Sequence, residues 1–81
     1  MYQEIEAPLS EIIIMSYELV VFDKDNSNII LKRIFQDENL AIQHYEKQLK
    51  IYHNITKRVI IKLYDLNKCT NIKYYDTDDN I

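Results

Sequence analysis

Residues 37–53 read DENLAIQHYEKQLKIYH, and this stretch decides the fold. Its apolar side chains recur at the spacing of one helical face, with charged and polar residues on the opposite side: Ala41, Ile42, Tyr45, Leu49 and Tyr52. Asp37 is a suitable N-cap, because its short carboxylate accepts from the free amides of a first turn. We expect Asn54 to end the helix in the left-handed conformation that glycine usually takes. The stretch therefore predicts one amphipathic helix.

Two strand-like segments precede this helix and two follow it. Residues 12–22, 29–35, 58–65 and 72–75 are rich in β-branched and aromatic side chains, and polar Asx-rich runs separate them at 23–28 and 66–71. The order predicts a small α+β domain of ββαββ type, a mainly antiparallel sheet with the helix on one face. We expect this domain at 12–75, a flexible N-terminal arm at 1–11 and a frayed acidic tail at 76–81.

The length of 81 residues allows one core. Cys69 is the single cysteine, so no disulfide is possible within the chain, and this usage fits a reducing cytosol. The first residues lack the basic start and apolar stretch of a signal peptide, and the run 12–15 is too short to cross a bilayer. We expect a cytoplasmic protein with no membrane partner.

One helix covers only one face of such a sheet. The other face would carry Val20 together with five residues that we predict to bind a partner: Phe22, Ile30, Ile34, Ile60 and Tyr64. Either the sheet curls and the N-terminal arm folds over this face, or the face packs on another chain. The expected partner is another protein or a second copy in a homodimer.

The cations suggest a second function. All ten lysines and arginines lie between Lys24 and Lys73, although the net charge of the chain is −3. Cations interleaved with tyrosines are typical of surfaces that bind single-stranded nucleic acid. The residues of this strip would be Lys32, Arg33, Lys57, Arg58 and Lys62. The alternative interpretation is a solvated sheet edge that its lysines protect from aggregation.

Catalytic and cofactor motifs are not recognisable in the sequence. The absence of glycine excludes a Walker loop and a dinucleotide fingerprint. Residues 23–34 begin like a calcium loop but have Asn28 and Ile34 where glycine and the bidentate glutamate belong. His44, His53 and Cys69 do not have a zinc spacing. We therefore expect no enzyme, no cofactor and no metal.

The two predicted hairpins resemble each other. Residues 21–25 and 63–67 each contain an apolar residue, an aromatic residue, an aspartate, any residue and an Asx residue. Shared turn chemistry and an internal duplication both explain this likeness. Without glycine, we expect Asn or Asp wherever a turn requires a positive φ.

Residue usage bears on origin. Isoleucine, lysine, asparagine and tyrosine are abundant, whereas glycine is absent and proline occurs once, as in AT-rich genomes. The sequence thus predicts a small non-enzymatic protein-binding module, an accessory protein of a virus, phage or mobile element. A nucleic-acid-binding protein is the alternative.

Overall fold

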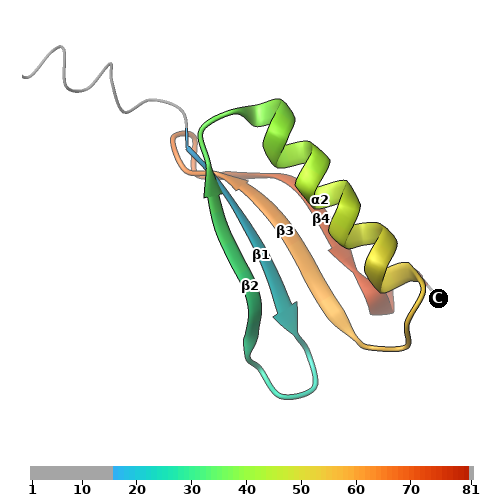
Figure 1. Ribbon diagram of the computed structural model, residues 1–81. Coiled ribbons are helices and arrows are strands. Elements are labelled where there is room, and N and C mark those ends of the chain that lie inside the picture. Colours follow the sequence, from blue (N-terminus) through green and yellow to red (C-terminus); the bar gives the residue numbers. More distant parts are fainter. Residues whose placement is uncertain (1–15, 81) are drawn as a thin grey trace, which may run out of the picture.

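The computed structural model describes residues 16–80, which form an antiparallel sheet with one helix against one face (Figure 1). The elements are β1 (Tyr17–Asp23), β2 (Ile29–Phe35), α2 (Glu38–His53), β3 (Val59–Asp65), β4 (Thr70–Asp76) and the 3-10 turn η2 (Thr77–Asn80). The predicted ββαββ order is confirmed. The expected arm at 1–11 and the first residues of the predicted first strand, 12–15, lie outside the described residues.

The strand order in the sheet is β2-β1-β3-β4, and every neighbouring pair is antiparallel. Helix α2 crosses one face of the sheet and connects edge strand β2 to β3. Strand β3 pairs with β1, so the two hairpins are joined at the centre of the sheet. The central strands β1 and β3 alternate between buried and half-buried residues, whereas the edge strands β2 and β4 are largely exposed. Alternation with a period of two gives each central strand one core face and one open face.

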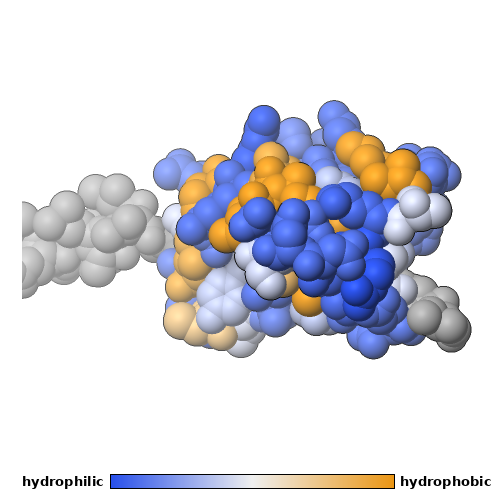
Figure 2. All heavy atoms as spheres, turned by 90° about the horizontal axis from the view of Figure 1, so that it is seen from below, coloured by the Kyte–Doolittle hydropathy of each residue, from blue (hydrophilic) through white to orange (hydrophobic). Residues whose placement is uncertain are grey.

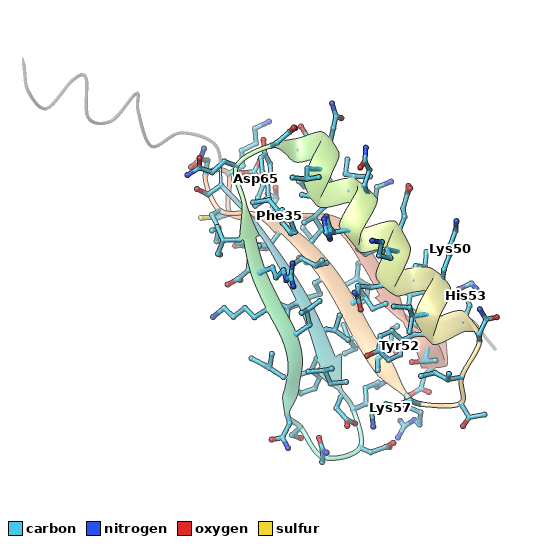
Figure 3. All side chains as sticks on the ribbon, in the orientation of Figure 1. Phe35, Lys50, Tyr52, His53, Lys57 and Asp65 are labelled. Carbon is cyan, nitrogen blue, oxygen red and sulfur yellow. The ribbon has the colours of Figure 1, made fainter. Side chains whose placement is uncertain are left out.

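The core lies between the helix and the sheet. Tyr45 and Tyr52 of α2 are buried, and Tyr52 points toward the sheet while Lys50 points away from it (Figure 3). Fully buried aliphatic side chains of the central strands meet them, namely Leu19, Val21, Val59, Ile61 and Leu63. Burial of each such side chain contributes about 1.5–3 kcal/mol, so this layer stabilises the fold.

The N-cap of α2 agrees with the prediction from sequence, and the C-cap does not. Asp37 is the N-cap, and its carboxylate accepts from the amide of Asn39 at 3.0 Å, as expected. Asn54 is the C-cap, but its φ of −101° is not left-handed, so that prediction was wrong. Its side-chain amide instead donates to the carbonyl of Lys50 at 3.1 Å. This bond satisfies a free carbonyl of the last turn without a left-handed residue.

The hairpin loops use unexpected residues at positive φ. Ser27 has a φ of 62° and Cys69 a φ of 56°, where we expected Asn or Asp. The first aspartate of each loop instead accepts a backbone hydrogen bond at 2.9 Å. Asp23 accepts from the amide of Asp25, and Asp65 accepts from the amide of Asn67. These Asx turns start each loop, and the left-handed residue closes it.

The two hairpins are also alike in space. The register shifts once in each hairpin, between Val21 and Phe22 and again at the corresponding residues of β3. Val20 pairs with Lys62 across the central strands, and these two residues also occupy corresponding positions in the two hairpins. A local two-fold axis therefore passes between Val20 and Lys62 and relates β1–β2 to β3–β4.

The acidic C-terminal segment is held rather than frayed up to the last described residues. Asp76 ends β4 and forms an ion pair with Lys24 at 2.7 Å. Thr77 bonds to both backbone groups of Val59 through its hydroxyl, at 2.6 Å each. Asp78 pairs with Arg58 at 2.7 Å. These partners are distant in the sequence, so local composition gives no sign that this segment is held.

Candidate binding groove on the open sheet face

The sheet face that α2 does not cover is hollowed into an open groove of about 600 Å³. Its lining comes from all four strands and from the β1–β2 loop. The apolar and aromatic lining residues are Val20, Phe22, Ile29, Ile60, Tyr64 and Tyr74, and the polar ones are Glu18, Ser27, Lys32 and Lys62. We call this hollow the sheet groove.

The strand register arranges the lining in rows across the sheet. In the middle row Val20 lies between Lys32 on β2 and Lys62 on β3, and Lys62 in turn lies beside Tyr74 on β4. Because neighbouring strands are about 4.8 Å apart, the two lysine backbones are about 10 Å apart. The middle row thus has a lysine on each side of Val20.

The rows on either side differ in chemistry. Toward the β1–β2 loop, Phe22 lies between Ile29 and Ile60, and these three groove residues are apolar. Asp76 follows beside Ile60 on β4 and is paired with Lys24. At the opposite end, Glu18 lies between Ile34 and Tyr64. The groove therefore has an apolar end, a cationic middle and an end with one carboxylate.

The groove charges are only partly compensated. Lys32 contacts Glu18 at 3.4 Å, and the Lys32 side chain is 56% exposed. Lys62 is half-buried, and no carboxylate of residues 16–80 forms an ion pair with it. Burial raises the pKa of the Tyr64 phenol, so its hydroxyl stays protonated at neutral pH and can donate a hydrogen bond.

The predicted partner-binding residues take different places. Phe22, Ile60 and Tyr64 line the groove. Ile34 is on the same face, opposite Glu18, and is 55% exposed. Ile30 is not part of the lining, because the register shift after Val21 aligns Ile29 with Phe22 and leaves Ile30 without a place in the pairing.

Sequence reasoning missed Ile29 and Tyr74 as groove residues. An unbroken alternation along 29–35 assigns Ile29 to the helix side, and no pattern in the sequence marks the shift in register. No local pattern in the sequence distinguishes Tyr74 from the other tyrosines. Its position opposite Lys62 follows from the pairing of β4 with β3, which is a contact between strands rather than a local pattern.

The predicted basic strip is split between separate places. Lys32 and Lys62 lie in the groove, while Arg33 is opposite Leu19 and so belongs to the helix side of the sheet. Lys57, in the turn after α2 (Figure 3), pairs with Asp23 at 2.8 Å, and Arg58 pairs with Asp25 at 2.8 Å. The structure does not bring these five cations together on one surface.

A dense ion-pair cluster occupies the end of the molecule with the β1–β2 loop and η2, which is mainly hydrophilic with separate hydrophobic patches (Figure 2). The hydrogen bond from Lys57 lowers the pKa of Asp23, and bonds from Lys24 and Arg58 lower those of Asp76 and Asp78. The same bonds raise the pKa of Lys24 and Lys57. These five groups stay charged at neutral pH.

The metal-ligating residue types of residues 16–80 take separate places. No three His, Cys, Asp or Glu side chains in this range are placed to hold a metal ion. The ring of His44 packs on Phe35 at 4.8 Å and the ring of His53 on Tyr75 at 5.3 Å, which fixes α2 to both edge strands. Cys69 is exposed in the β3–β4 loop. The helix of the described region is neither long nor apolar enough to span a membrane.

The sheet groove thus offers apolar, aromatic and charged groups together on the sheet face that α2 does not cover. Comparison with protein families, with curated proteins and with solved structures gave no match.

Proposed function

We propose that the protein is a non-enzymatic binding module that holds a segment of another protein in the sheet groove. One observation carries this proposal: apolar and aromatic side chains line a groove that no described element covers. Protein interfaces use such side chains at their centres, with polar groups around them. The groove charges favour a segment with apolar and acidic residues, since two lysines face one glutamate.

A protein segment fits the charges better than nucleic acid does. Binding to phosphates needs several free cations. Lys57 and Arg58 are already paired with aspartates, and Arg33 belongs to the other side of the sheet. The groove itself contributes Lys32 and Lys62, and the whole chain has a net charge of −3.

The setting of this function is also a proposal. The AT-rich residue usage supports an accessory protein of a virus, phage or mobile element. The single cysteine supports action in the cytoplasm.

Selection from a displayed library of random peptides tests the proposal. We expect the full chain to enrich a set of binding peptides, and Tyr74→Ala to weaken their binding about tenfold, as loss of an aromatic contact does. Ile51→Ala is the matched control, because Ile51 is 46% exposed on α2 and Tyr74 is 51% exposed at the groove. Peptide affinity should be unchanged in this variant.

Three outcomes would contradict the proposal. The first is an absence of enriched peptides, or equal loss of affinity in both variants. The second is binding of a labelled single-stranded oligonucleotide at about 50 mM salt, reduced by Tyr74→Ala, which would favour the nucleic-acid function. The third is a dimer in light scattering that Tyr74→Ala converts to a monomer, because a second copy would then occupy the groove.

A further inference from the structure

We propose that the partner places a carboxylate over Val20, between Lys32 and Lys62. This inference rests on the proposed function, because it names the group that the occupant of the sheet groove must carry. It starts from the middle row of the groove, where the two lysines flank Val20 from adjacent strands. Flexible four-carbon stems allow both ammonium groups to reach one anion.

Lys62 supplies the stronger part of the attraction. It is half-buried between Val20 and Tyr74 in the register, and no carboxylate of residues 16–80 pairs with it. An ammonium that loses further water without a partner is destabilised, so an apolar segment alone would bind poorly above it. A carboxylate on that segment offsets this loss and becomes better shielded from solvent as the groove fills.

Lys32 can turn to the same anion at little loss. Its contact with Glu18 is 3.4 Å, longer than the 2.7–2.9 Å or so of a strong charge-assisted bond, and it is exposed to solvent. Exposed pairs of this kind contribute about 0–1 kcal/mol. Release of Lys32 from Glu18 therefore does little to the stability of the fold.

Glu18 fixes where the carboxylate goes. It lies one row away from Val20, beside Tyr64, and it repels a second carboxylate at that end of the groove. The groove residues on the other side, around Phe22, are apolar and suit apolar side chains. An extended segment presents alternate residues to one face, so the acidic residue should have an apolar neighbour two positions away.

Peptide selection on charge variants tests this inference. The wild-type chain should enrich peptides with Asp or Glu, whereas Lys62→Glu should enrich peptides with Lys or Arg instead. Lys50→Glu makes the same change of charge on the side of α2 that points away from the sheet, and it should keep the preference for acidic peptides (Figure 3). Lys62→Met should weaken the binding of peptides selected on the wild-type chain about tenfold or more. It should also reduce the dependence of this binding on salt.

The outcomes separate this inference from the proposed function. The proposed carboxylate would be wrong if the enriched peptides lacked acidic residues, or if they bound Lys62→Met as tightly as wild type. The groove would still be the binding site in that case. An absence of any enriched peptide would overturn both. Thermal unfolding of each variant shows whether a loss of binding comes from a loss of the fold.

Discussion

Ser27 and Cys69 are the residues whose backbone is least suited to their side chains. Both have positive φ, a region in which a Cβ atom approaches the neighbouring carbonyl oxygen. Each follows an Asx turn at the same spacing, so the loop geometry requires the conformation whichever residue occupies the position. Glycine would adopt it without the steric penalty, and this chain has none.

Substitution at Cys69 measures this strain. We expect Cys69→Gly to be as stable as the wild type or up to about 1 kcal/mol more stable, because removal of Cβ offsets the added freedom of the unfolded chain. Cys69→Val should lose about 1–2 kcal/mol, since a β-branched residue is poorest at positive φ. Urea unfolding at pH 7 in reducing buffer provides the comparison. Equal stability of the Gly and Val variants would contradict the strained geometry.

At the scale of elements, helix α2 is held at its ends as well as along its buried face. The Asp37 carboxylate satisfies a free amide of the first turn, and Glu38 complements the positive end of the helix dipole. Ring contacts from His44 and His53 then connect the helix to β2 and β4. The helix is thus fixed across the whole width of the sheet.

Changes at the N-cap should separate capping from charge. Asp37→Ala is expected to reduce the free energy of unfolding by about 1 kcal/mol, because the amide of Asn39 loses its acceptor. Asp37→Asn should retain most of the stability, since the Asn side chain also caps well. Guanidinium unfolding followed by circular dichroism gives both values. A similar loss in both variants would mean that charge, and not the cap bond, stabilises this end.

The sequence predicted the features that depend on local periodicity and not those that depend on contacts between strands. The apolar spacing of α2 and the alternation in β1 and β3 identified the core and the open face. The register shift at Val21, which brings Ile29 rather than Ile30 into the groove, arises from pairing with β2. The pairing of Asp76 and Asp78 with Lys24 joins residues far apart in the chain, so it left no local signal.

At the scale of the whole molecule, the ion-pair cluster joins three separate parts of the chain. Lys24 and Asp25 come from the β1–β2 loop, Arg58 from the residue just before β3, and Asp76 and Asp78 from the C-terminal segment. The same loop contributes Ser27 to the groove wall, so these bonds help to fix the shape of the groove. The ion pairs that stabilise this end of the fold therefore also position part of the sheet groove.

The depressed pKa values of Asp23, Asp76 and Asp78 predict acid sensitivity. Groups whose pKa is lower in the folded state stabilise the fold above their ordinary pKa of 3.8, and this stabilisation is lost as pH falls through the lower folded values. The melting temperature should therefore decline as pH falls below about 4. Asp78→Asn should melt lower than wild type at pH 7 and show a smaller decline. Equal slopes in the two proteins would contradict a contribution from Asp78.

The two-fold axis between Val20 and Lys62 has a consequence for the direction of a bound chain. A segment that crosses this axis meets nearly the same backbone layout after half a turn, so the sheet alone would accept it running either way. Side chains remove this equivalence, because Lys62 corresponds to Val20 and Glu18 corresponds to Ile60. Half a turn moves a side chain of the segment from Lys62 to Val20, or from Ile60 to Glu18, so a charged segment meets different charges in its two directions. The charged side chains Glu18, Lys32 and Lys62 thus select one direction of binding on a sheet whose backbone is symmetric.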